Sequence, residues 1–291
     1  MPVNEGFKFR DVNISSPIFR AEPNNEVVHS KFWYFYQNRK IKTNNEGFRN
    51  DIDYVATQTS PMVAVIGDSY VEAVQVDYNE TFFSILHNQL QPSGRCYSFG
   101  FSGAPLSQYL IWAEYAFQKF KAQNVVFSII SNDFDESLVK YKQSKGSHFY
   151  VPGPDSLHYL QRFDYKRSFL NKAVSHSALA RYLYANIQIT ALPQKLTNFF
   201  KDTNDSFVGN VASNVSSTRI SDSQLAINLF FRDLPTRVPL PKSKVVFILD
   251  GRFYGMKEKE INKSYFGQMR NYFLIKAASE GYRVIDLKRL F

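Results

Sequence analysis

The sequence is poor in the residues that set disulfide-rich, fibrous and disordered proteins apart. It has a single cysteine, Cys96, among 291 residues, which excludes an internal disulfide framework and a zinc site built from a cysteine cluster. It has only 13 Gly and 12 Pro against 27 Phe and 18 Tyr, so most of the chain is neither disordered nor of low complexity. With 44% hydrophobic residues, it can bury the core of one large domain or two small ones.

Long hydrophobic runs are also missing. The longest apolar stretches, such as residues 125–130, are far shorter than the roughly 20 residues that span a bilayer. The first ten residues, MPVNEGFKFR, include no apolar stretch resembling a signal peptide. We therefore expect no membrane span in this chain. The compartment stays open, and a periplasmic or cell-envelope location is compatible with the single cysteine.

The charge is biased towards the positive sign. There are 35 Lys and Arg against 26 Asp and Glu, a net charge of +9 that favours contact with polyanions. The densest basic patch, residues 39–42, follows an aromatic run at 32–36. Such a mixture can stack on single-stranded bases, but it is also typical of a surface strand whose aromatics pack beneath the domain. We favour the second interpretation, so nucleic acid is not expected as a partner.

Hydrophobic patterning divides the chain. Residues 1–60 are polar and rich in Asn, and we interpret them as an N-terminal wrap around a domain that covers residues 61–291. The first half of this domain follows a strand–helix–strand–helix–strand pattern, with strands at 62–66, 95–99 and 125–130 and helices at 70–90, interrupted near 77–79, and 107–120. After Asp133 the pattern stops.

We expect an insertion at about 136–240, with a helix near 178–190 and a Ser/Asn-rich loop over 202–223. A strand at 244–250, a long amphipathic helix capped by Gly281 and a strand at 283–286 follow. The alternation predicts an α/β fold, a doubly wound (flavodoxin-like) three-layer sandwich with a five-stranded parallel sheet. In such folds the chemistry lies in the loops that follow the carboxyl ends of the strands.

Ser69 lies in the first of these loops. It comes directly after the first core strand and before its helix, where a hydroxyl would project from the edge of the sheet as a nucleophile, with its own amide available to an oxyanion. The alternative is a capping box formed by Ser69 and Glu72, in which both side chains only satisfy free amides at the start of a helix.

Two further loops carry residues that suit an oxyanion hole. Gly103 follows the second strand, where a missing side chain would let a backbone amide approach a ligand. Asn132 ends the third strand, and its side-chain amide could donate to the same oxyanion. A simple turn at Gly103 and a cap at Asn132 are the alternatives.

Together these residues resemble the motifs of the SGNH (GDSL) hydrolase family. Residues 67–69 (Gly-Asp-Ser) match its first motif, Gly103 its glycine motif, and Asn132 with Asp133 its Asn-Asp motif. The resemblance extends upstream to the Asn-x-x-Gly-Phe-Arg segment that ends at Arg49, which is common in bacterial members. It covers roughly residues 44–135 and 242–291.

The resemblance implies an esterase or O-acyltransferase. Ser69 would attack an ester carbonyl, the amides of Ser69 and Gly103 and the side chain of Asn132 would hold the oxyanion, and a histidine oriented by an aspartate would act as general base. We expect O-acyl esters as substrates, with acetyl as the acyl group and either a carbohydrate or another small molecule as the alcohol. The alternative function is that of a non-catalytic SGNH-like domain that binds a glycan or a protein partner.

One family motif, Asp-x-x-His after the last strand, is missing, because the chain ends five residues beyond Asp286. We therefore expect a C-terminally incomplete form of a longer protein, almost inactive alone, whose further segment supplies the His and the Asp. The internal alternative is His158, which has the spacing to Asp155 but lies in the expected insertion. No metal-ligand spacing, Walker loop or Rossmann fingerprint is present, so we expect no metal or nucleotide cofactor.

Overall fold

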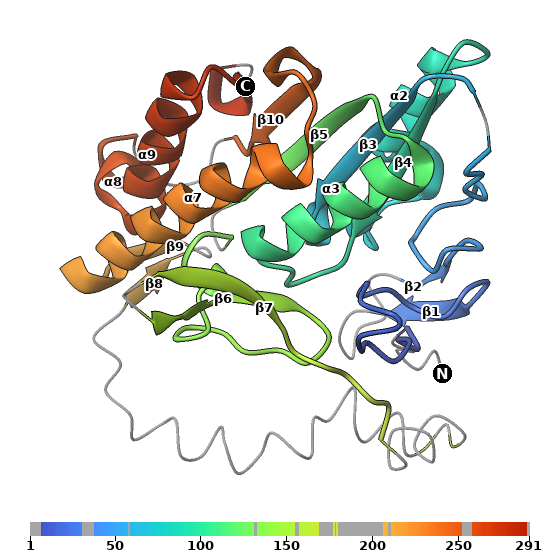
Figure 1. The fold of residues 1–291 in the computed structure, drawn as a ribbon, viewed down its shortest axis with the longest axis horizontal. Coiled ribbons are helices and arrows are strands. Elements are labelled where there is room, and N and C mark those ends of the chain that lie inside the picture. Colours follow the sequence, from blue (N-terminus) through green and yellow to red (C-terminus); the bar gives the residue numbers. More distant parts are fainter. Residues whose placement is uncertain are drawn as a thin grey trace.

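The computed structural model of the chain has a parallel β-sheet at its centre, with helices on both faces (Figure 1). The residues it describes are 7–30, 38–57, 59–130, 133–154, 157–168, 177, 179, 206–208, 211–251 and 258–289. Within these ranges, no helix is both long and apolar enough to cross a membrane.

The sheet has five strands, and every neighbouring pair is parallel. In spatial order they are β4 (Arg95–Gly100), β3 (Met62–Gly67), β5 (Asn124–Ile129), β10 (Val245–Leu249) and β11 (Arg283–Asp286). Counted along the chain, this order is second, first, third, fourth and fifth, which is the flavodoxin-like arrangement. The predicted fold class is confirmed.

Alternate residues of the strands supply the two cores. Ala64 and Ile66 of β3 belong to the large core, whereas Val65 between them belongs to the smaller one, as the two-residue period of a strand requires. Helices α3 (Leu106–Phe120), α7 (Ser217–Arg237) and α9 (Tyr265–Ser279) cover the large core and pack side by side. Helices α1 (Ser69–Glu72) and α2 (Phe82–Leu90) cover the smaller core.

The structure corrects the expected organisation of residues 136–240. The loop expected over 202–223 instead includes the β8 (Ser206–Val208) and β9 (Val211–Asn214) hairpin and the first turns of α7. Helix α7 lies in the crossover between β5 and β10. Its N-cap is Ser216, whose Oγ accepts the amide of Arg219 at 3.2 Å. The helix expected near 178–190 lies outside the described residues.

Two other expected helices are subdivided. The segment 70–90 consists of α1, a 3₁₀ turn at Tyr78–Glu80 and α2, so the predicted interruption near 77–79 is confirmed. The long helix expected before Gly281 consists of α8 (Glu258–Lys263) and α9, because Ser264 begins a new helix there as an N-cap.

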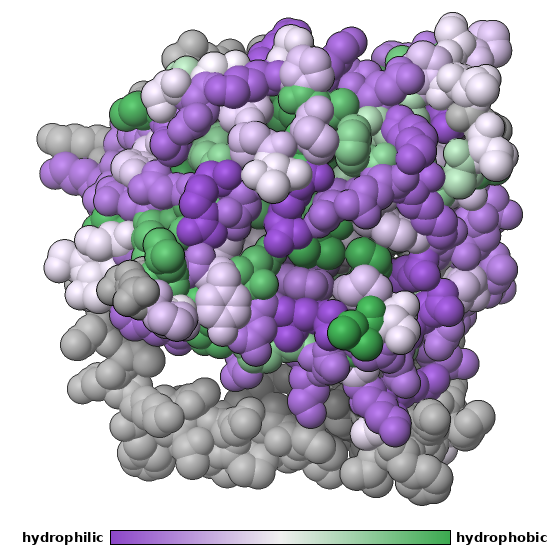
Figure 2. All heavy atoms as spheres, viewed as in Figure 1, coloured by the Kyte–Doolittle hydropathy of each residue, from purple (hydrophilic) through white to green (hydrophobic). Residues whose placement is uncertain are grey.

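The surface over this fold is mainly polar. On the face shown in Figure 2, hydrophilic side chains predominate, and hydrophobic ones occur in small separate groups. Hairpin β6 (His148–Pro152) and β7 (His158–Arg162) packs next to α3, and hairpin β1 (Glu26–Ser30) and β2 (Asn38–Lys42) belongs to the N-terminal part of the chain.

Candidate active site

Ser69 is the first residue of α1, directly beyond the carboxyl end of β3. The strand ends at Gly67, and Asp68 is the N-cap of the helix, with its Oδ1 accepting the amide of Tyr70 at 3.1 Å. Ser69 is partly exposed, and its hydroxyl donates to the other oxygen of Asp68, Oδ2, at 3.0 Å. The sheet therefore presents a serine hydroxyl at the edge where the prediction placed it.

The capping-box interpretation of Ser69 is wrong. Asp68, one residue earlier, caps the helix, so Ser69 is not needed for that task. The carboxylate of Glu72 turns to the neighbouring loop, where its Oε2 accepts the amide of Ser102 at 2.8 Å and also the hydroxyl of Ser102. Neither member of the expected box caps α1 with its side chain.

Gly103 lies in a tight turn after β4. The amide of Ala104 donates to the carbonyl of Phe101 at 3.1 Å, and Gly103, at the third position of this turn, has a φ of +76°. A positive φ at this position is typical of a type II turn and strongly favours glycine. The N–H of Gly103 makes no hydrogen bond to the described residues, and the residue is exposed.

Asn132, the third expected oxyanion donor, lies outside the described residues. Its neighbour Asp133 is fully buried, and its carboxylate accepts the amide of Ile130 at 2.8 Å and the hydroxyl of Tyr109 at 2.9 Å. Burial raises the pKa of Asp133 well above its usual range, and the charge of Asp68 adds to this effect. Asp133 thus fixes the end of β5 through buried hydrogen bonds.

Sequence reasoning missed Asp250, which follows β10 at the same edge. One of its carboxyl oxygens, Oδ1, is buried with no hydrogen-bond partner among the described residues. Burial raises the pKa of Asp250 to about 7, opposed by Arg270 and reinforced by the charge of Asp68. Aspartate at a strand end is common, so only its burial in the fold distinguishes this residue.

Lys142 was also missed, although it lies against Gly103. Its Nζ donates to the carbonyl of Gly103 at 2.7 Å and pairs with the carboxylate of Glu136. The two ends of the first contact are 39 residues apart in the sequence. No local pattern connects them, so this contact could be found only in the structure.

No described histidine hydrogen-bonds to Ser69. The Nδ1 of His87 accepts the amide of Cys96 at 3.1 Å. His148 is buried next to Gln108, and burial lowers its pKa to about 3. His158, the internal alternative for the base, lies in β7, where its carbonyl accepts from Arg232 of α7.

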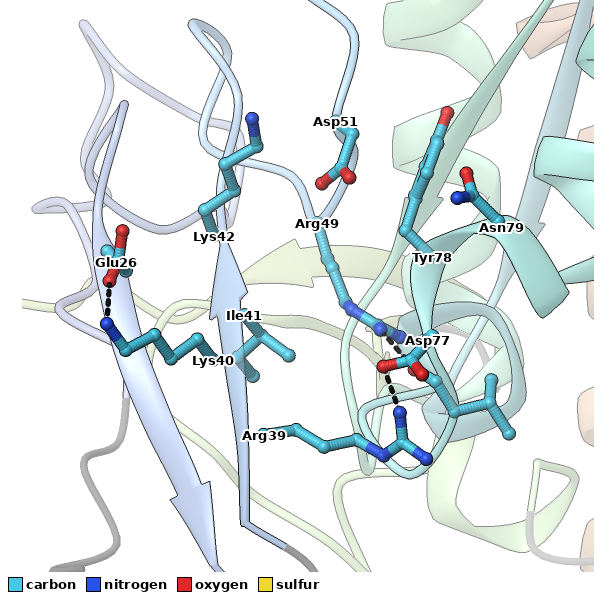
Figure 3. A pocket seen from close by; sticks show the side chains of 11 residues that line it. Glu26, Arg39, Lys40, Ile41, Lys42, Arg49, Asp51, Asp77, Tyr78 and Asn79 are labelled. Atoms are coloured by element: carbon cyan, nitrogen blue, oxygen red, sulfur yellow. Dashed lines mark hydrogen bonds and ion pairs between the residues drawn. The ribbon is translucent and has the colours of Figure 1, made fainter.

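A cavity of about 300 Å³ lies between β2 and residues 76–79 (Figure 3). Its lining carries charges of both signs, with an ion pair between Arg39 and Asp77. Arg49 lines this cavity too, and its buried guanidinium donates to the carbonyls of Glu72 at 2.5 Å and Val76 at 2.6 Å. Arg49 therefore secures the carboxyl end of the helix that begins with Ser69.

The rest of the Asn-x-x-Gly-Phe-Arg segment shapes the turn that presents Arg49. The Oδ1 of Asn44 accepts the amides of Glu46 and Phe48 at 3.0 and 3.1 Å. Gly47 has a φ of +84°, and a Cβ there would lie 2.0 Å from the carbonyl oxygen of Ala21. No residue with a side chain fits this position, so the segment has a structural role in supporting α1.

No protein-family model matches the chain, and no curated protein matches it. Solved structures similar to it include TesA, with a TM-score of 0.39 and 11% identity over 77% of this chain and 76% of TesA. A mutant of the esterase AlinE4 has a TM-score of 0.37 and 9% identity over 79% and 77%. The acetyl xylan esterase Est2A from the rumen bacterium Butyrivibrio proteoclasticus has a TM-score of 0.35 and 10% identity, covering 86% of this chain and 59% of Est2A.

Proposed function

We propose that this chain is a serine hydrolase of the SGNH type that acts on O-acyl esters, with Ser69 as its nucleophile. The observation that carries the proposal is the position of Ser69, together with the residue that caps its helix. Ser69 is partly exposed at the carboxyl edge of a parallel sheet. The adjacent Asp68 caps the helix, so a capping role does not account for the serine. Active sites of open α/β sheets lie at this edge.

The reaction would begin with attack of Ser69 Oγ on the ester carbonyl. The resulting oxyanion would be held by the amides of Ser69 and Gly103 and by the side chain of Asn132. Gly103 is exposed and its N–H makes no hydrogen bond to the described residues, which supports this role. Collapse of the intermediate breaks the bond to the alcohol and leaves an acyl group on Ser69, which passes to water in hydrolysis or to another hydroxyl in acyl transfer.

A serine hydroxyl needs a base to accept its proton during attack. In this structure the hydrogen-bond acceptor of Ser69 is Asp68, whereas the family resemblance gives the role of base to a histidine. We propose that acetyl is the acyl group and that a carbohydrate is the alcohol. Esters of other acids and of other alcohols are the alternative substrates.

The experiment follows hydrolysis of nitrophenyl acetate and of an acetylated oligosaccharide, with and without added imidazole as an external base. Ser69→Ala should abolish hydrolysis and labelling by a serine-directed phosphonate. Ser279→Ala is the matched control, since Ser279 is exposed at the end of α9, where its hydroxyl donates to the carbonyl of Lys276. Hydrolysis and labelling that persist in Ser69→Ala would contradict the proposal. Binding of a glycan without any hydrolysis would favour the non-catalytic alternative.

A further inference from the structure

We infer that Lys142 is a positioning residue, which holds the turn that contains Gly103 at a fixed position relative to Ser69. The inference rests on the proposed function, because it concerns the backbone amide of Gly103 that would bind the oxyanion. It is drawn from the contacts that the Phe101–Ala104 turn makes on its two sides.

On one side the turn is attached to the helix of the nucleophile. Glu72 is only 6% exposed, and its Oε2 accepts both the amide and the hydroxyl of Ser102. Burial raises the pKa of Glu72, while the hydrogen bonds from Ser102 and the charge of Arg49 lower it. Because Glu72 and Ser69 belong to the same single-turn helix, this contact ties the turn to the nucleophile.

On the other side the turn is attached to the segment that follows β5. The Nζ of Lys142 donates to the carbonyl of Gly103 at 2.7 Å and pairs with Glu136 in the 3₁₀ turn Asp135–Ser137. The hydroxyl of Ser137 in turn accepts the amide of Ser107 at 3.0 Å, near the start of α3. Glu136 is four residues beyond Asn132, so Lys142 connects the two loops that would supply oxyanion donors.

The contacts from Glu72 and Lys142 each pair a charged side chain with a backbone group of opposite polarity in the turn. A carboxylate binds the N–H of Ser102, and an ammonium group binds the carbonyl of Gly103, so both are charge-assisted hydrogen bonds. Between these two anchored groups lies the N–H of Gly103, which makes no hydrogen bond to the described residues. The arrangement fixes the turn on both sides and leaves one donor for a substrate.

The ordinary alternative is that Lys142 only forms a surface ion pair, which would contribute little to stability and nothing to turnover. The two roles differ in what they predict. A misplacement of about 1 Å in a catalytic group can cost about 100-fold in rate. Loss of a positioning contact should therefore lower kcat and leave KM almost unchanged, because the oxyanion forms only in the transition state.

The experiment compares Lys142→Met with Lys140→Met in the full chain, with imidazole added to all proteins as the external base. Lys140 offers the same side chain two residues earlier, but its Nζ binds Asp222 at 2.7 Å and does not contact the turn. In Lys142→Met we expect kcat for nitrophenyl acetate and the rate of phosphonate labelling at Ser69 to fall about 10- to 100-fold, with KM within about twofold. Lys140→Met should keep the wild-type values, and Lys142→Arg should recover most of the lost rate.

The outcomes separate this inference from the proposed function. If the wild type is labelled at Ser69 and Lys142→Met reacts as fast as Lys140→Met, the inference is overturned and the nucleophile stands. If the wild type shows neither labelling at Ser69 nor Ser69-dependent hydrolysis, the proposed function fails and the inference fails with it. A fall in labelling that Lys142→Arg reverses, with an unchanged thermal midpoint, supports the positioning role.

Discussion

The hydroxyl of Ser69 donates to Oδ2 of Asp68 at 3.0 Å, while Oδ1 of the same carboxylate accepts the amide of Tyr70. One side chain thus caps α1 and orients the proposed nucleophile. Asp68 is buried, and burial raises the pKa of its carboxyl against the lowering effect of these hydrogen bonds. The start of the helix and the direction of the hydroxyl cannot be changed independently.

Substitutions of Asp68 should separate its cap from its charge. Both Asp68→Asn and Asp68→Ala remove the carboxylate, but only asparagine keeps an acceptor for the amide of Tyr70. We expect Asp68→Ala to have a free energy of unfolding about 1 kcal/mol lower than Asp68→Asn, measured by urea denaturation. Equal stability of the two variants would mean that the cap contributes nothing.

Asn132 should matter for turnover and not for folding. Loss of one oxyanion donor typically lowers turnover about 100- to 1,000-fold, so Asn132→Ala should reduce hydrolysis of nitrophenyl acetate by that order. Asn88→Ala, an exposed position on α2, is the control. A wild-type rate in Asn132→Ala would show that Asn132 serves only as a cap.

Asp250 should make stability depend on pH. Its pKa is about 7 in the folded protein against 3.8 for an unperturbed aspartate, so between these values the folded state binds more protons than the unfolded state. The free energy of unfolding therefore falls as the pH rises through this window. Between about pH 5 and about pH 8, we expect the wild type to lose roughly 2 kcal/mol more than Asp250→Asn.

The comparison at low pH serves as the control for Asp250. Below about pH 4.5 the folded wild type carries a neutral carboxyl at this position, so its stability should approach that of Asp250→Asn. Parallel pH profiles for the two proteins, measured by urea denaturation across the whole range, would show that Asp250 is not the group responsible.

The central strand β3 could be predicted from the sequence because it is a short apolar run that is mostly buried on both faces. Helix α7 was missed, since its first residues are mostly polar and its buried positions begin at Ser223. Pro235, a residue that disfavours a helix interior, lies within the last turn of this helix.

For the site, the position of Ser69 followed from the strand before it, but its hydrogen bonds did not. The Ser-x-x-Glu pattern pointed to a capping box, and the structure instead directs Glu72 to Ser102, 30 residues away. Lys142 and Asp250 have no sequence signal of their own, because a contact between distant loops and the burial of one carboxyl are properties of the assembled fold.

The guanidinium of Arg49 supports the segment of the proposed nucleophile from outside the domain expected over residues 61–291. Helix α1 has only four residues, too few to be stable alone. The side chain of Arg49, which precedes residue 61, binds the carbonyl of the last helical residue, Glu72, and the carbonyl of Val76 beyond the helix. A shortened chain that begins at residue 61 would keep the sheet and every residue of the Gly-Asp-Ser motif. It would lose the guanidinium that binds the end of the proposed nucleophile's helix. We therefore expect any activity to depend on a part of the chain that carries none of the proposed catalytic groups.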